Sequence, residues 1–179
     1  MLSTVFLLTA SMVIGQAEDI SPHYQHLKDL EYFVGDWEIV GTLKVTGDFQ
    51  GLDEFEGVPL RQVLSYQWMK NKNFMLVSAR NTGEKLISYQ GFIGWDPVTE
   101  RIQSRDVNSQ GAWHKYVHIK RDFGWVMEGT AVYPGEAEGV YRAEIRIADK
   151  NSFRHVGKGT LKQGGKTSTV TLVYEAKRK

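Results

Sequence analysis

The sequence predicts an all-β protein, an antiparallel up-and-down barrel of about ten strands preceded by one short helix. Three observations support this fold class. From about residue 35 onward apolar and polar residues alternate, turn-forming residues interrupt the alternation at short intervals, and no helical pattern of roughly 10–15 residues separates the strands. The last observation argues against a parallel sheet of βαβ units. Regular spacing favours a closed barrel, which leaves no strand edge exposed, over the alternative of a two-sheet sandwich.

The first 17 residues, MLSTVFLLTASMVIGQA, predict a secretory signal peptide. They contain no charged side chain, are apolar from Val5 to Ile14, and end in Gly15-Gln16-Ala17, which supplies small residues before a cleavage site. No Lys or Arg precedes the apolar run, which departs from the usual pattern. The run is shorter than the roughly 20 residues that cross a bilayer. We therefore expect cleavage, a single barrel domain over residues 18–179, a secreted or periplasmic location and no membrane insertion.

A short helix is predicted between Ser21 and Phe33. Ser21-Pro22 is a typical helix start, apolar residues follow at helical spacing, and Gly35 is a typical stop. The segment WEIVGTLKV, residues 37–45, then alternates as a strand does, with Trp37 on its apolar face.

Nine more strands are predicted after the first. They lie near residues 60–69, 73–80, 86–95, 100–107, 112–120, 124–133, 138–148, 151–160 and 167–176. Asn, Asp, Gly and Pro between them are typical of hairpin turns. The longest irregular stretch, 47–58, is acidic and glycine-rich, and it is either a lid over a barrel mouth or a solvated loop.

Composition and motifs exclude several classes of function. Lys and Arg number 22 against 21 Asp and Glu, a formal charge of +1, which gives no electrostatic reason to expect nucleic acid or an anionic membrane as partner. The sequence contains no G-x-S-x-G, Walker A or G-x-G-x-x-G motif and no cysteine. His114 and His118 share a strand face but lie about 13 Å apart, too far for one ion. We expect no metal and no cofactor.

Three segments resemble a known family. LEYFVGDWEI resembles the short helix and Gly-x-Trp strand that begin lipocalin-like (calycin) barrels. WMKNKNFMLVS and IGWDPVTERIQSRDVNSQGAW resemble a bacterial family of lipocalin-like domains of unknown function, related domains of which occur alone or fused to steroid-isomerase/NTF2-like domains. The resemblance runs from about Leu27 onward and implies a barrel with an apolar interior and a small-molecule pocket. Asn108 stands where relatives commonly carry Asp, so a carboxylate role there is lost.

Haem-binding barrels of the nitrobindin type also begin with Gly-x-Trp, and their iron ligand is a histidine late in the chain. His155 is the one late histidine, but the rest of that motif is missing. We therefore interpret His155 as a strand histidine whose hydrogen bonds are made by its neighbours.

Two turns set the predicted register around the strand 100–107. If the turn Asp96–Thr99 closes a simple hairpin, Trp95 lies opposite Glu100. If Asn108–Gly111 closes the next, Asp106 lies opposite Trp113 and Ser104 opposite Lys115. The apolar residues that this register turns into the barrel are Tyr89, Ile93, Trp95, Ile102, Trp113, Val117 and Ile119. A slip of one residue would reverse the faces, exposing two tryptophans and burying two arginines.

This register places polar side chains on the interior face. Asp106, Ser104 and Lys115 lie there, flanked by Tyr89 and Trp113. They are either a solvated Asp–Lys pair near the barrel rim or the polar end of a ligand cavity, with Asp106 as proton acceptor and Tyr89 as hydrogen-bond donor. The inward tryptophans that would form its aromatic walls are Trp37, Trp95, Trp113 and Trp125.

Three functions are consistent with the sequence. The first is an exported barrel that binds a small hydrophobic molecule in its interior. The second is a proton-transfer enzyme, such as an isomerase or cyclase, that uses Asp106 with Tyr89 or Lys115. The third is a structural or interaction module whose barrel is filled. A cavity of roughly 300–1,000 Å³ would favour the first two.

Overall fold

The computed structural model describes residues 19–47, 59–82 and 87–179. The predicted signal peptide, residues 1–17, lies outside the described residues, as does nearly all of the predicted lid or loop at 47–58.

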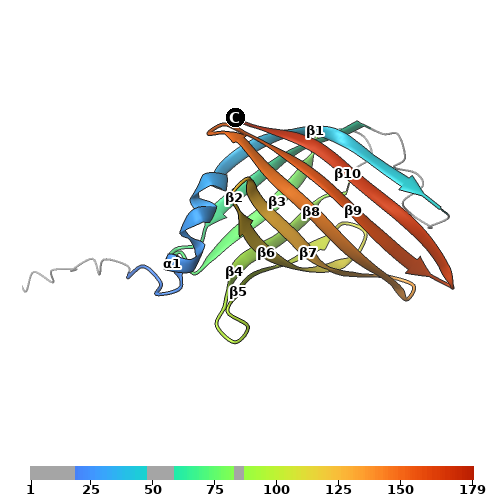
Figure 1. Ribbon diagram of the computed structural model, residues 1–179, viewed down its shortest axis with the longest axis horizontal. Coiled ribbons are helices and arrows are strands. Elements are labelled where there is room, and N and C mark those ends of the chain that lie inside the picture. Colours follow the sequence, from blue (N-terminus) through green and yellow to red (C-terminus); the bar gives the residue numbers. More distant parts are fainter. Residues whose placement is uncertain (1–18, 48–58, 83–86) are drawn as a thin grey trace, which may run out of the picture.

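Ten antiparallel strands form a closed barrel, and this confirms the predicted fold class (Figure 1). Each strand pairs with its neighbours along the chain, and the first pairs with the last. The strands are β1 (Gly35–Thr46), β2 (Pro59–Trp68), β3 (Phe74–Asn81), β4 (Tyr89–Asp96), β5 (Arg101–Asn108), β6 (Trp113–Arg121), β7 (Gly124–Tyr133), β8 (Ala137–Asp149), β9 (Ser152–Gln163) and β10 (Lys166–Arg178). The sheet closes on itself rather than splitting into the two sheets of a sandwich.

The predicted helix is two shorter elements, α1 (Tyr24–Leu27) and the 3-10 helix η1 (Lys28–Phe33). They lie across one end of the barrel, as Figure 1 shows. The three apolar residues Leu27, Leu30 and Phe33 are buried and join the main core cluster. We call this end, with the core beneath it, the plugged end.

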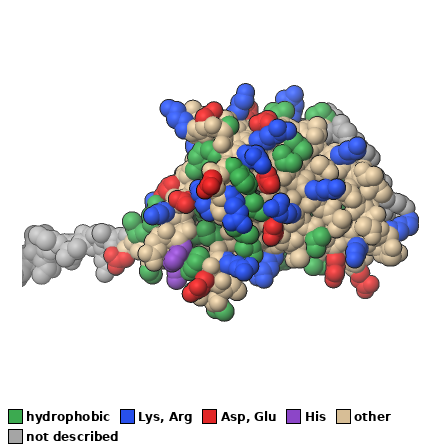
Figure 2. Space-filling model, in the orientation of Figure 1, with side chains coloured by type: hydrophobic (Ala, Val, Ile, Leu, Met, Phe, Trp, Pro, Cys, Tyr) green, Lys and Arg blue, Asp and Glu red, His purple; other side chains and the backbone are tan. Residues whose placement is uncertain are grey.

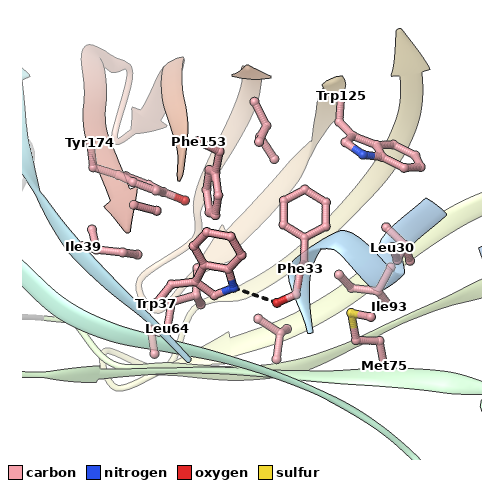
Figure 3. Packing of buried hydrophobic residues seen from close by; sticks show 14 of the residues in the cluster. Leu30, Phe33, Trp37, Ile39, Leu64, Met75, Ile93, Trp125, Phe153 and Tyr174 are labelled. Carbon is pink, nitrogen blue, oxygen red and sulfur yellow. Dashed lines mark hydrogen bonds between the residues drawn. The ribbon is translucent and has the colours of Figure 1, made fainter. Parts of the chain in front are cut away.

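Aromatic packing and hydrogen bonds both hold the plug in place. Figure 3 shows Trp37, Phe33 and Phe153 together, and the Trp37 indole donates to the Phe33 carbonyl at 2.7 Å. The guanidinium of Arg178, at the end of β10, lies over the Trp37 ring at 4.2 Å. It also donates to the carbonyls of Val34 and Tyr32 at 2.5 and 2.6 Å. The end of β10 is therefore hydrogen-bonded to the end of η1.

A second, smaller core cluster lies further along the barrel. Its buried members are Val45, Ala137 and Leu161. On the outer face seen in Figure 2, basic and acidic side chains are interspersed, as the nearly balanced charge leads one to expect.

Candidate ligand-binding site

A cavity of about 260 Å³ occupies the barrel interior between the two core clusters. Its apolar wall includes Ile39, Leu60, Ile93 and Leu172. Polar side chains from β4, β5, β6, β8 and β9 also line it, and two hairpins determine which of these point inward.

The β4–β5 hairpin keeps the predicted faces although its loop is longer than predicted. Trp95 lies opposite Ile102 rather than Glu100, a shift of two residues. The reason is a four-residue loop, 97–100, in which Glu100 takes a positive φ of 51°. The Asp96 carboxylate accepts hydrogen bonds from the Val98 amide at 2.9 Å and the Thr99 hydroxyl at 2.8 Å. A shift of two leaves every side chain on its predicted face.

The β5–β6 hairpin differs from the prediction by one residue, and this reverses β6. Asp106 lies opposite His114, and Trp113 lies opposite Val107. The loop has three residues between the paired positions Asn108 and Ala112. The Asn108 amide donates a hydrogen bond to the Ala112 carbonyl at 3.1 Å. Gly111 takes a positive φ of 80°, as the left-handed residue of a three-residue hairpin loop does.

The reversed strand corrects the predicted site. Trp113 is 69% exposed and Lys115 is also exposed, so their placement on the interior face is wrong. The same error affects Val117 and Ile119, which alternate with the inward side chains. His114, Tyr116 and His118 line the cavity instead.

Two hydrogen-bonded pairs join β5 to β6 inside the cavity. His114 donates from Nδ1 to Asp106 Oδ1 at 2.6 Å, and both side chains are only 11–12% exposed. Ser104 Oγ and His118 Nε2 are 2.8 Å apart. Burial lowers the pKa of His118 to about 4, so that its imidazole is neutral at pH 7. Asp106 and Ser104 therefore face inward as predicted, but each has a histidine as partner.

His155 forms a third polar group on the opposite wall. Its ring stacks on Tyr174 with centroids 4.5 Å apart, and its Nε2 is 2.8 Å from the Tyr141 hydroxyl. The residue is 3% exposed, and burial lowers its pKa to about 3. Its Nδ1 is buried and has no hydrogen-bond partner among the described residues. Neighbours thus satisfy one ring nitrogen of His155, whereas the other is buried without a partner in the described part of the chain.

Six of the eight tyrosines line the cavity: Tyr66, Tyr89, Tyr116, Tyr133, Tyr141 and Tyr174. Burial raises the pKa of Tyr89 and Tyr116 well above the usual 10, and the negative charge of Asp106 raises both further. Their hydroxyls are therefore protonated at neutral pH. The hydroxyls of Tyr66, Tyr89, Tyr116 and Tyr174 make no hydrogen bond to any described residue. These four tyrosines line the cavity, where water or a ligand can be the hydrogen-bond partner of their hydroxyls.

Glycines opposite the polar side chains give them room. Gly91 lies opposite Asp106, and a Cβ on Gly91 would come within 2.4 Å of the Asp106 Cβ. Gly157 lies beside the Tyr141 hydroxyl, where a Cβ would be only 1.7 Å away. A glycine inside a strand can indicate such a close approach, and this signal was available in the sequence.

The other predicted site residues fall into two groups. Tyr89 lines the cavity as predicted. Trp37 and Trp125 are buried in the core of the plugged end, and Trp95 stacks on His26 with ring centroids 3.9 Å apart. None of these three is among the described residues that line the cavity, so tyrosines rather than tryptophans form its aromatic wall.

The described ranges contain neither a candidate metal site nor a candidate membrane-spanning helix. No group of three or more His, Asp or Glu side chains there could hold a metal ion. No helix within the same ranges is long and apolar enough to cross a bilayer.

Comparisons with known proteins give a likeness of structure alone. No protein family matches the sequence, and no curated protein matches it either. Among the solved structures that match is an S-type phycobiliprotein lyase from Guillardia theta. It is 12% identical, has a TM-score of 0.48, and is matched over 86% of this chain and 93% of its own.

Proposed function

We propose that this protein binds a small, largely apolar molecule with one or two polar groups inside its barrel. The observation that supports this most is the cavity of about 260 Å³, in which an apolar wall surrounds polar groups that lack protein partners. Ligand sites typically combine a mostly apolar wall with a few polar groups that orient the ligand. The volume lies just below the roughly 300–1,000 Å³ of common pockets, which favours a ligand smaller than most drugs.

A filled barrel without ligand accounts less well for the interior. A purely structural core would be expected to fill its interior with close-packed side chains. Here the described residues of the interior instead surround a cavity of about 260 Å³. We therefore rank the structural module below the binding protein.

Native mass spectrometry of the protein purified from its own host tests the proposal. We expect a reproducible added mass that disappears on denaturation. The double variant Tyr89→Phe/Tyr116→Phe keeps both aromatic rings and removes two hydroxyls from the cavity. It should retain less of the added mass than the wild-type protein does. A bare chain at every purification step, with no ligand gained from host extract, would contradict the proposal.

A second candidate, a proton-transfer enzyme, is favoured by the Asp106–His114 pair. With Nδ1 of His114 held by Asp106 at 2.6 Å, Nε2 is the ring nitrogen that is left to act as a base. A carboxylate that orients a histidine in this way is a common arrangement for accepting protons. Tyr89 or Tyr116 could donate to the oxygen on which negative charge develops. In this version His114 replaces Lys115 as the partner of Asp106.

Hydrogen exchange distinguishes the enzyme from the binding protein. The ligand released from the host-purified protein is incubated with fresh protein in D₂O, and its C–H signals are followed by NMR. The enzyme should catalyse exchange at one position, and Asp106→Asn should slow it at least about a hundredfold. A ligand that stays unexchanged and unchanged would exclude the enzyme while leaving the binding function in place.

Export is part of the proposal and rests on the sequence of residues 1–17. The mature protein should begin near Glu18 and occur outside the cytoplasm. Intact-mass measurement of the protein from fractionated host cells checks this, and a cytoplasmic chain that retains residues 1–17 would refute it.

A further inference from the structure

The charges around the cavity restrict which ligand it can hold. We infer that the cavity selects neutral or cationic molecules and rejects carboxylates and other anions. This inference rests on the proposed binding function and specifies the chemical class of the ligand.

The first argument is the inventory of charged groups. Among the described lining residues Asp106 is the one acidic side chain, and no Lys or Arg is present. His118 and His155 are neutral at pH 7 because burial lowers their pKa values to about 4 and about 3. The remaining polar lining groups are phenols, amides and a serine hydroxyl, which are uncharged at this pH.

The second argument is that the one histidine beside Asp106 already has this carboxylate as its partner. His114 Nδ1 lies 2.6 Å from Asp106 Oδ1, so a positive charge on the imidazole would be balanced inside the protein. The pair therefore offers no unpaired positive charge to an anion. A carboxylate ligand would therefore lose its hydration without gaining a counter-charge, which is costly in a buried site.

The third argument is that neutral and cationic groups do find partners. A hydroxyl or carbonyl can bond to the tyrosine hydroxyls that line the cavity. An ammonium group can approach the Asp106 carboxylate and lie against the tyrosine rings, which attract cations. The same cavity thus accommodates two of the three charge classes.

Three matched probes test the inference. Phenylacetate, 2-phenylethanol and 2-phenylethylamine share one skeleton and are anionic, neutral and cationic at pH 7.5. Their dissociation constants are measured by isothermal titration calorimetry, beside the octanoate, octanol and octylamine series. We expect the alcohol and the amine to bind at least about tenfold more tightly than the carboxylate.

Two variants test whether Asp106 is the source of the charge selectivity. Asp106→Asn should weaken amine binding about tenfold and leave the alcohol within about threefold. The control Asp122→Asn removes the same charge from an exposed turn and should change none of the three constants. Circular dichroism checks that both variants fold, and the wild-type ranking needs no variant.

The outcomes separate the inference from the function on which it rests. Equal or tighter binding of the carboxylates would overturn the inference and leave the binding function standing. Failure of every probe in both series to bind would count against both. Unchanged amine binding in a folded Asp106→Asn protein would remove Asp106 as the source of the selectivity and would overturn the inference.

Discussion

The two parts of the barrel interior contrast in whether aromatic rings fill the space. In the plugged end the rings pack on one another, with Trp37 and Phe33 at 4.9 and 5.4 Å from Phe153. In the cavity, tyrosine and histidine rings line an open volume of about 260 Å³. Both parts are rich in aromatic rings, so composition does not separate them. The contrast indicates that the plugged end contributes mainly stability and the cavity mainly recognition.

The largest expected effect comes from truncating the plugged end. Phe153 is fully buried, and its ring lies 4.9 Å from that of Trp37. Phe153→Ala should lower the free energy of unfolding by about 3–5 kcal/mol, because it removes a large buried side chain and leaves a cavity. Urea denaturation measures the change. Tyr116→Phe, which removes one cavity hydroxyl, is the contrasting variant, and a similar loss in both would break the distinction between the two parts.

Acid should act mainly through the cavity. His155 has a folded-state pKa of about 3, below the ordinary value of 6.5. The unfolded chain therefore binds a proton that the folded protein does not, so stability is complete above pH 6.5 and falls as the pH drops toward 3. At pH 5 the loss from this residue should be about 2 kcal/mol. Denaturation midpoints at pH 7.5 and 5 measure it.

The control for the acid effect is His155→Phe, which keeps an aromatic ring against Tyr174. Its stability should depend less on pH between 7.5 and 5 than that of the wild type. The same dependence in both proteins would show that His155 does not carry the effect.

A smaller effect is expected from filling the space beside Asp106. In Gly91→Ala the new methyl group would lie 2.3 Å from the Arg105 carbonyl and 2.4 Å from the Asp106 Cβ, so the two strands must move apart. Overpacking of this kind typically costs about 1–3 kcal/mol. Thermal unfolding measures the cost, and Val98→Ala, at a position 89% exposed in the loop between β4 and β5, is the control. An unchanged melting temperature would show that β4 and β5 tolerate the displacement.

The smallest effect tests the register of β6 directly. Trp113 is 69% exposed, so Trp113→Ala should change the free energy of unfolding by no more than about 0.5 kcal/mol. Trp125→Ala, at a position 2% exposed, should cost about 3–5 kcal/mol. The register predicted from the sequence, which buries both residues, requires large losses in both. Chemical denaturation of the two variants therefore decides between the registers.

Much of the fold could be predicted because it depends on local patterns. Alternation and turn residues indicated ten strands, and the inward positions of Tyr89, Ser104 and Asp106 follow from them. The four-residue loop at 97–100 did not affect the predicted inward positions, since a register shift of two residues leaves each side chain on the same face of the sheet.

The partners of Asp106 and Ser104 could not be predicted in the same way. They depend on whether the loop after Asn108 holds an even or an odd number of residues, and Gly111 was the available signal for an odd one. The role of His155 also lay beyond local patterns, because Tyr141 and Tyr174 reach it from neighbouring strands. Contacts between strands depend on register, which alternation alone does not fix.

The number of residues in the loop between Asn108 and Ala112 determines which side chains of β6 line the cavity. Removing one loop residue would present Trp113 and Lys115 to the interior in place of His114, Tyr116 and His118, with no change of side chain elsewhere. Insertions and deletions here would therefore alter ligand preference in a single step, whereas point substitutions would need several. For evolution or engineering, this loop offers a route to new binding specificities on an unchanged scaffold.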